Sequence, residues 1–485
     1  MTTELLGSST TGSRLASARR LAALALMLSA TSACQELLEV ELPGQITGDQ
    51  LESPLMADIW KNSAIGRAEC AIQAYIHWDD NADVWWRGIG YQGGAWEYRD
   101  RPSTVTTCGR TGTSYGWYVP MQVARSENEK VYNAYTAWKD DEVADRTLGL
   151  ALTALFAGYT YQLLGERMCE LAVDLGPLMT PDEVQTRAEE RFTEALGHVP
   201  TGDFSLPSIP SVRQAALLGR ARALFWKGDY VGAAADAALV TDPDFVAYVT
   251  RDNSEHERRN HIFDVGVSSS QATVAEAIYH PYGEPNAELI PFTGYYRLDA
   301  TAVDGQGRPI VHPLAIDAEG RSNVGGFPLY ADDPGTVVDP RVPVLMSNLI
   351  IPASTIPMVG QWKYQAIDAP IPFARWAEAK LILADIALIN DDLTAAIGHV
   401  NELRDVHSLP NYTVASPTAQ DVKDLILEER RREFFLEGRW AGTKIRENLW
   451  FPLGEGSTPP GYPYLEGTCM LMPEIEYELN PHLSN

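Results

Sequence analysis

The sequence has few of the residue patterns that mark catalytic or nucleotide-binding sites. It contains no His-Glu-x-x-His and no Gly-x-x-x-x-Gly-Lys, and its nine histidines are scattered without metal-binding spacing. Asp79, Asp80 and Asp83 lie close together, but the ligand spacing and closing glutamate of an EF-hand are missing. Nothing singles out a pair of opposed carboxylates, as a glycosidase needs, although acids are abundant. We therefore expect no catalytic residue, no cofactor and no metal ion.

Basic residues are also few. The 485 residues include 38 Lys and Arg against 65 Asp and Glu, so the formal net charge is -27. A surface of this sign repels nucleic acid and anionic membranes, and it disfavours polyanionic ligands. The chain is long enough to form a core without staples.

Beyond its first 33 residues, the sequence lacks an apolar run of the roughly 18 residues that a membrane helix needs. Residues 1–33 have the plan of an export signal, in which basic residues precede a short apolar run and small residues lead to a cysteine. These parts are Arg14, Arg19 and Arg20, then residues 21–30, then Thr31-Ser32-Ala33-Cys34. The last four residues resemble a bacterial lipobox, so we expect lipidation of Cys34. The alternative is an ordinary signal peptide that ends at Ala33.

Cysteine is scarce in the rest of the chain. Besides Cys34 there are Cys70, Cys108, Cys169 and Cys469. An even number in an exported protein is compatible with disulfides. Four thiols allow three full pairings, among which the sequence does not choose, and buried free thiols are the alternative.

Helical periodicity is the main pattern that the sequence does contain. Apolar residues at helical spacing predict helices over residues 54–75, 147–174, 181–198 and 211–226. After the last of these, Gly228-Asp229-Tyr230 precedes a run of alanines, which is the tetratricopeptide pattern: glycine turns the chain, tyrosine packs between helices and alanines permit close approach. A second copy covers residues 375–404. Because the copies lie far apart, we expect helical pairs that are interrupted by other structure.

Two segments break the helical pattern, at about residues 78–118 and 246–370. Both are rich in Gly, Asp and aromatic residues, and we expect them to be irregular. So much irregular chain in one domain indicates a functional insert or disorder, and the aromatic residues argue against disorder. Aromatic residues among glycines can form stacking platforms for sugar rings. The alternative is that these side chains fold back and cover the helical core.

Residues 421–440 form a dense run of charge. Glu428 and Glu429 are placed to pair with Arg432 along a helix, and Gly438 is a C-terminal stop. A buried stripe is indicated by Val422, Leu425, Ile426, Phe434 and Phe435. On periodicity alone, this stretch is a solvated charged helix.

The order of residues in this run resembles the signature "E-R-R-x-E-L-x-F-E-G-x-R-W" of SusD/RagB-type outer-membrane nutrient-binding lipoproteins. Here residues 427–434 read Leu-Glu-Glu-Arg-Arg-Arg-Glu-Phe and residues 437–440 read Glu-Gly-Arg-Trp, with Leu436 in place of the usual phenylalanine. Three more stretches are similar to family landmarks and fall in the expected order. They are Glu39-Val40-Glu41-Leu42-Pro43 with Ile46-Thr47, then Pro372-Phe373-Ala374-Arg375-Trp376-Ala377-Glu378, and finally residues 473–481 with Asn480-Pro481.

The resemblance spans essentially all of residues 34–485, which we expect to form a single SusD-like domain after the signal peptide at 1–33. It implies a mainly α fold, a tetratricopeptide-like helical scaffold with a long loop-rich insert, and a charged C-terminal motif that acts as a structural brace. It further implies capture of oligosaccharides, or of peptides, for a TonB-dependent transporter of the SusC type. The protein would be lipid-anchored at the outer membrane and would face outside. Carried over by region, the expected ligand-binding residues are Trp85, Trp86, Trp96, Tyr295 and Tyr296.

Two other functions stay open at this point. A secreted glycan hydrolase would turn over a bound glycan, whereas a helical-repeat scaffold that binds only protein would have no small ligand. The sequence does not identify the ligand, and its net charge only disfavours polyanions.

Overall fold

The computed structural model describes residues 52–77, 116–265, 340–350, 357–413, 415–451 and 469–483. It also describes residues 102 and 104 and the short pieces 85–87, 106–108, 272–274, 295–303, 309–315, 329–330 and 465–466. Contacts divide the chain into two units, Met1–Ser53 and Pro54–Asn485. The second unit contains every element described below, and it is mainly α-helical.

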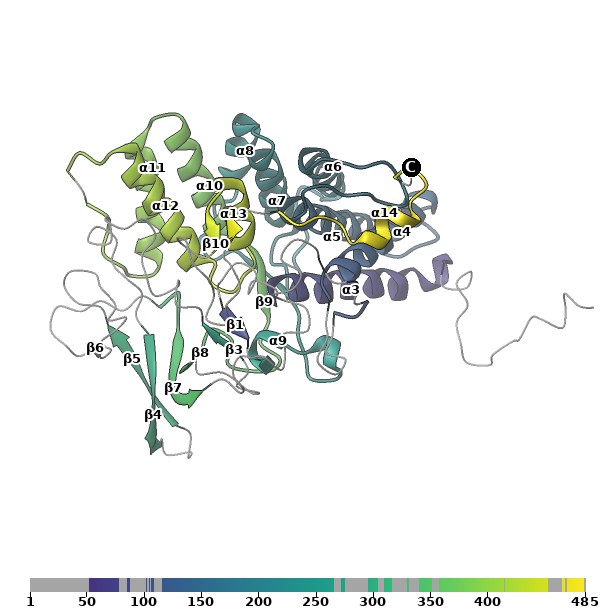
Figure 1. Ribbon diagram of the computed structural model, residues 1–485. Helices are drawn as coiled ribbons and strands as arrows, with labels where there is room; N and C mark the ends of the chain where they lie inside the picture. Colours follow the sequence, from purple (N-terminus) through teal and green to yellow (C-terminus); the bar gives the residue numbers. More distant parts are fainter. Residues whose placement is uncertain are drawn as a thin grey trace, which may run out of the picture. The chain divides into compact units, whose positions relative to one another are not determined.

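Helices make up the first half of this unit (Figure 1). A short 3-10 helix, η1 (Pro54–Met56), leads into α3 (Ala57–His77), and the following helices are α4 (Tyr118–Ala137), α5 (Arg146–Arg167), α6 (Pro181–His198), α7 (Val212–Trp226) and α8 (Tyr230–Ala237). Each packs on the next in the order of the chain. The predicted helices are thus confirmed, with α6 having the predicted bounds and α5 ending before the predicted residue 174.

A second set of helices continues the first in space. It consists of α10 (Trp376–Ile389), α11 (Leu393–Val406), α12 (Ala419–Glu433) and α13 (Trp440–Glu447). The last helix, α14 (Glu474–Leu479), instead lies beside α4, where the Tyr118 hydroxyl donates to Glu476 at 3.4 Å (Figure 1). Because α10 packs on α7 and α8, the two tetratricopeptide-like pairs become neighbours although a long insert separates them in sequence (Figure 1). Gly228 has φ +83° and makes the predicted turn between α7 and α8. Tyr230 differs from the prediction, since it stays 37% exposed and touches Phe225 at the edge of the pair.

Close approach of helices defines the core around Phe192 of α6. Its ring meets Tyr159 of α5 edge-on at 4.9 Å between centroids. A Cβ atom on Gly219 of α7 would lie 2.4 Å from this ring, and one on Gly158 would lie 2.7 Å from it. Real side chains do not tolerate such distances, so glycine at both positions lets three helices share one aromatic side chain.

The sequence led us to expect no segment after residue 33 that could cross a membrane, but within the described residues α5 is one helix that is long and apolar enough to do so. Its most apolar window is 94% buried against the rest of the protein. It is therefore packed as the core helix of the scaffold.

The insert is not wholly irregular, which differs from the expectation for residues 246–370. It contains η4 (His256–Arg258), α9 (His261–Phe263) and a five-stranded sheet ordered β6-β5-β4-β7-β8. These strands are β4 (Tyr295–Val303), β5 (Pro309–Ala315), β6 (Leu329–Tyr330), β7 (Val344–Ile350) and β8 (Pro357–Gln361). Pairing is antiparallel except between β4 and β7. Pro309 and Pro313 hide β5 from sequence patterns, because proline inside a run of residues usually argues against a strand.

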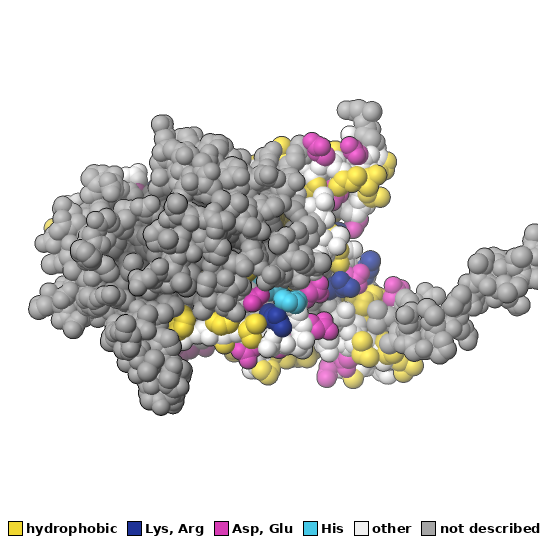
Figure 2. Space-filling model, turned by 60° about the horizontal axis from the view of Figure 1, so that its bottom comes forward, with side chains coloured by type: hydrophobic (Ala, Val, Ile, Leu, Met, Phe, Trp, Pro, Cys, Tyr) yellow, Lys and Arg dark blue, Asp and Glu magenta, His cyan; other side chains and the backbone are white. Residues whose placement is uncertain are grey.

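Three two-stranded sheets tie other parts of the chain together. The strands β2 (Val246–Val249) and β9 (Ile371–Arg375) pair at the two ends of the insert and so close it at its base. The strands β1 (Trp85–Arg87) and β3 (Ala272–Val274) pair, as do β10 (Trp450–Phe451) and β11 (Leu465–Glu466). On the face seen in Figure 2, basic and acidic side chains of the described residues are interspersed, and the basic ones form no continuous patch there.

The C-terminal segment is fastened to the end of α5. A disulfide joins Cys169 to Cys469, with 5.0 Å between Cα atoms. Beside it, the amide of Met470 donates to the carbonyl of Arg167, and the amide of Cys169 donates to the carbonyl of Met470, each at 2.8 Å. Farther along, the side-chain amide of Asn480 donates to the carbonyl of Gly176 at 2.7 Å. The pairing that the sequence left open is thus Cys169 with Cys469, and Cys70 with Cys108.

Candidate functional site

The predicted ligand-binding tryptophans lie on a strand that pairs with the insert. Trp85 is opposite Val274 and Trp86 is opposite Thr273 in the β1–β3 pair. The aromatic segment near residue 85 and the insert near residue 273 are therefore side by side in the fold.

The predicted tyrosines begin strand β4 of the five-stranded sheet. Tyr295 is opposite Leu314 of β5, and Tyr296 lies between Pro313 of β5 and Leu345 of β7. Strand β3 contacts β8, the edge strand of this sheet, so β1 and β3 adjoin the sheet that carries the tyrosines (Figure 1). Four of the five predicted residues thus lie on one group of strands. Trp96 and Cys34 lie outside the described residues, as do the aspartates at 79, 80 and 83.

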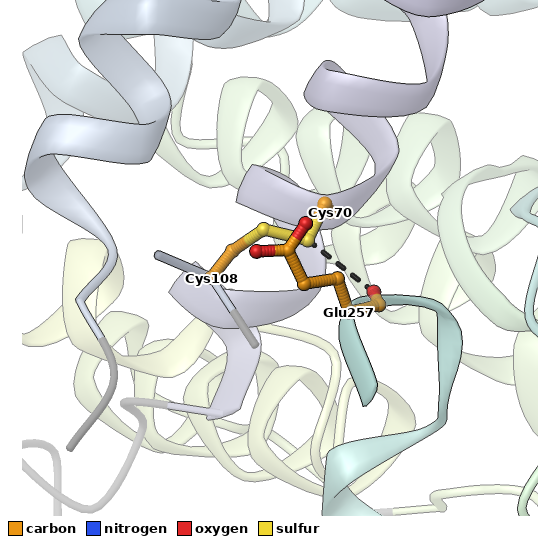
Figure 3. Close-up of side chains that lie close together, drawn as sticks. All are labelled: Cys70, Cys108 and Glu257. Atoms are coloured by element: carbon orange, nitrogen blue, oxygen red, sulfur yellow. Dashed lines mark hydrogen bonds between the residues drawn. A yellow bond between two sulfur atoms is a disulfide. The ribbon is translucent and has the colours of Figure 1, made fainter. Parts of the chain in front are cut away.

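A disulfide fixes the end of the aromatic segment to the scaffold. Cys70 projects from α3 and is bonded to Cys108, with 5.8 Å between Cα atoms (Figure 3). Next to it, the hydroxyl of Thr107 donates to a carboxylate oxygen of Glu257 in η4 at 2.6 Å. The Cys70 sulfur lies 3.3 Å from the Glu257 carbonyl oxygen. Since the two sulfurs are bonded to each other, this group has no thiolate to hold a metal ion, and its effect is to join three segments.

The charged motif is buried, so the interpretation as a solvated helix is wrong. Helix α12 ends at Glu433, and a turn through Leu436 and Gly438 follows, both with positive φ. The buried charged residues of the motif are Glu428, Glu429, Arg430, Arg431, Arg432, Glu433, Glu437 and Arg439. Their partners come from several distant segments, as the resemblance to a structural brace implies; we call these residues and their partners the brace.

Glu429 and Glu433 hold the middle of the brace. Glu429 accepts from Arg404 of α11 at 2.5 Å and also from Arg341, which lies three residues before the start of β7. Glu433 accepts from Arg375 at the end of β9 and lies 3.1 Å from the His407 ring nitrogen. The expected pairing with Arg432 is made by Glu428, at 2.5 Å, and not by Glu429.

Glu437 holds the outer end of the brace. It accepts from Lys363 at 2.5 Å and from the Nε of Arg375 at 2.8 Å. The Lys363 ammonium also donates to the carbonyl of Phe435 at 2.8 Å, and the Arg375 guanidinium lies 4.7 Å from the centre of the Phe434 ring. The brace therefore joins the insert to the helical scaffold at both ends of the β7–β8 hairpin.

The brace forms the floor of a cleft of about 480 Å³. Aromatic side chains line its walls: Tyr248 comes from β2, and Trp362 directly follows β8. Both are half-buried. The Trp362 amide donates to the Pro343 carbonyl at 2.8 Å, and the side-chain amide of Gln365 donates to the Trp362 carbonyl at 3.2 Å, so the segment is held in place on both sides.

Burial and neighbouring charge shift several groups in this cleft. Burial by itself raises the pKa of Glu433, but Arg375, His407 and Arg341 together hold that pKa well below its usual range. Burial lowers the pKa of Lys363, and Glu437 opposes this. Burial, together with Glu437, raises the pKa of the Tyr248 hydroxyl. The floor of the cleft thus contains the ionised carboxylate of Glu433, which is already engaged with cations.

Sequence reasoning did not find this cleft. Tyr248 is far from Trp362 and Arg375 in sequence, and the pairing of β2 with β9 brings it to the segment that carries Arg375. An aromatic-cation pair at Trp362-Lys363 was the one local signal.

Comparison with known proteins points to one family. Residues 357–441, which include β8, β9 and most of the brace, match the model of the SusD family. None of the curated proteins matches the chain closely enough to count as a relative.

Solved structures with the same fold cover nearly the whole chain. A SusD superfamily protein of Bacteroides vulgatus ATCC 8482 is 13% identical with a TM-score of 0.58, and the match covers 89% of this chain and 98% of that one. A SusD superfamily protein of Bacteroides fragilis is 14% identical with a TM-score of 0.53, covering 91% and 100%. A third protein, from Bacteroides vulgatus ATCC 8482 and described as sugar-binding, is 12% identical with a TM-score of 0.55, covering 88% and 97%.

Identities this low show the fold alone, whereas the family model matches the segment that contains the charged motif. The brace, the family match and the fold agree with one another. The chain therefore has the fold of SusD superfamily proteins, and its residues 357–441 match the SusD/RagB family.

Proposed function

We propose that this protein is a surface-exposed outer-membrane lipoprotein that binds oligosaccharides, or peptides, and delivers them to a TonB-dependent transporter of the SusC type. The observation that carries the proposal is the SusD-family match at residues 357–441 in a chain that has the SusD fold over most of its length. The sugar binding ascribed to one protein of the same fold supports an oligosaccharide. The lipobox-like stretch before Cys34 supports anchoring, with acylation of that cysteine as the anchor.

The strands β1 and β4 support an aromatic platform for the ligand. A strand alternates its positions between two faces, so positions 85 and 86 lie on opposite faces, as do positions 295 and 296. A platform on one face therefore uses one residue of each pair. This gives the proposal a sharp test, because single substitutions within a pair should differ in effect.

Binding is tested with a glycan and peptide array, using wild type and the single variants Trp85→Ala, Trp86→Ala, Trp96→Ala, Tyr295→Ala and Tyr296→Ala. Loss of one stacking contact should weaken binding about two- to tenfold in one variant of each pair and leave the other variant near wild type. Tyr230→Ala is the matched control, since this exposed tyrosine lies on α8, away from these strands. Equal binding by all variants would contradict the platform.

Anchoring and partnership are tested in the native host. Tagged wild type should fractionate with the outer membrane and bring down a large β-barrel transporter, whereas Cys34→Ala should be released from the membrane. If both versions are soluble and no barrel co-purifies, the delivery function is wrong.

The protein is proposed to act without catalysis. One local pattern favours a hydrolase as the alternative: Gly112-Thr113-Ser114-Tyr115-Gly116 has the letters of the Gly-x-Ser-x-Gly nucleophile turn. That motif requires a strand before the serine and a helix directly after it, and residues 109–115 lie outside the described residues. Incubation with any glycan or peptide that the array identifies should give no product. Turnover that Ser114→Ala abolishes would establish the hydrolase instead.

A further inference from the structure

In the cleft above the brace, the basic side chains are more exposed to solvent than the acidic ones. Within the described residues, its lining includes Lys363, Arg375 and His407, whose side chains are 18%, 14% and 26% exposed. The acids between them are almost closed off, since Glu433 is 1% exposed and Glu437 is 4% exposed. Solvent in the cleft therefore meets the cations of these ion pairs and hardly meets the acids.

The residues that line the cleft also have a net positive charge. Arg341, Lys363 and Arg375 stand against Glu433 and Glu437, which leaves one positive charge even with His407 neutral. Behind the floor of the cleft, Glu429 and Arg404 form an ion pair, so their charges cancel. In a chain with a net charge of -27, a cleft with a positive excess is a local exception, and it favours an anionic group over a cation or a polyanion.

The aromatic walls of the cleft are suited to packing against a sugar ring. Tyr248 and Trp362 are half-buried aromatic side chains that line it, and the exposed Gln365 adds an amide. Aromatic faces together with a few polar groups are the usual lining of small-molecule sites, which occupy roughly 300 to 1,000 Å³. A cleft of about 480 Å³ is near the lower end of that range and has room for about one or two sugar rings.

We propose that this cleft is a second binding site, for a sugar residue that carries a carboxylate, as a uronic acid does. The carboxylate lies against Lys363 and Arg375, and the ring packs on Trp362 and Tyr248. The choice of a sugar rests on the proposed function, whereas the cleft and its positive excess do not. None of the described residues that line the cleft lies on β1 or β4, the strands that carry four residues of the predicted aromatic platform.

The test is isothermal titration calorimetry with galacturonate, digalacturonate, galactose and inorganic phosphate as probes. The wild type should bind the two uronates and should bind galactose at least about tenfold more weakly, because galactose lacks the charge-assisted contact. Lys363→Gln should lower uronate affinity about tenfold or more, and Tyr248→Phe and Gln365→Ala should lower it less. These last two variants change groups at the surface of the cleft, so they report on binding even if the lysine variant is unstable.

Lys227→Gln is the matched control. Its ammonium pairs with Glu189 at 2.6 Å and is 22% exposed, much like Lys363 with Glu437, but it lies at the end of α7. Uronate affinity should be unchanged in this variant. Thermal unfolding of each variant confirms that it is folded.

Three results would overturn the proposal. They are equal binding of galactose and galacturonate, binding of phosphate as tight as that of galacturonate, and unchanged uronate affinity in all the cleft variants. None of these affects the proposed function, which fails separately if the platform variants all keep their array binding and no transporter co-purifies.

Discussion

Glu433→Gln should be one of the most destabilising single substitutions in the brace. Glu433 is buried, and its side chain is engaged by Arg375, by Arg341 at 3.3 Å and by His407 at 3.1 Å. Glutamine keeps the volume and one acceptor oxygen but removes the charge that balances these cations. Removing one partner of a buried ion pair costs about 3–5 kcal/mol, since the remaining charge stays buried. That is a large fraction of the roughly 5–15 kcal/mol that stabilises a typical domain.

The measurement is urea unfolding of wild type and variant at pH 7, with Glu190→Gln as the control. Glu190 pairs with Arg187 at 3.0 Å, but both side chains are about half exposed. Such surface pairs contribute at most about 1 kcal/mol. If Glu433→Gln lowers the free energy of unfolding no more than Glu190→Gln does, the buried charge of Glu433 does not stabilise the fold.

The same substitution predicts a pH dependence. The pKa of Glu433 is well below its usual range in the folded protein, so its contribution is present above the unfolded pKa of about 4.3 and is lost as the pH falls toward the folded pKa. The wild type should lose this stability on acidification, and the variant has none of it to lose. The difference between the free energies of unfolding of wild type and Glu433→Gln should therefore be smaller at pH 3.5 than at pH 7.

Three further perturbations test other parts of the fold. Gly438→Ala places a Cβ 2.9 Å from a side-chain carbon of Ile76 at a position with φ +74°, so the free energy of unfolding in urea should fall by about 1–3 kcal/mol. The double variant Cys169→Ser, Cys469→Ser should lose about 2–5 kcal/mol in the same assay, and an unchanged value would show that the end of the chain is held without the disulfide. Burial lowers the pKa of His261 from 6.5 to about 4, so its stabilising contribution is full above pH 6.5 and is lost as the pH falls toward 4. In His261→Gln, the melting temperature should fall less steeply across that interval than in wild type, and parallel curves would contradict this.

The helices could be predicted because their signals are local. Apolar spacing and a Thr-Pro start define α6, where the Thr180 hydroxyl and the Glu183 carboxylate each accept from the other's backbone amide. The turn at Gly228 is local in the same sense, since its positive φ favours glycine. Adding the order of the motifs was enough for the fold class and the family.

The brace and the cleft could not be predicted, because their partners are distant in sequence. Glu433 looks like a solvated charge on α12, but in the fold it pairs with Arg341, which precedes the β7–β8 hairpin, and with Arg375 at the end of β9. The sheet was missed for another reason: strands such as β5, with two prolines, do not show the alternation of a half-buried strand. Disulfide pairing depends on the same distant contacts.

The bond between Cys169 and Cys469 makes a covalent ring of the chain between them, a stretch with a sequence separation of 300. Helices α6 to α13, the whole insert and the brace lie within this ring. A protease that cuts the insert once therefore opens the ring but releases no fragment, since both pieces stay joined through the bond. Strands β2 and β9 flank the insert and pair with each other apart from its five-stranded sheet. After a cut in the insert, this pairing therefore still holds the two pieces together at the base of the insert. Single nicks in this region should be visible on a gel only after reduction, and the nicked protein can keep its scaffold intact.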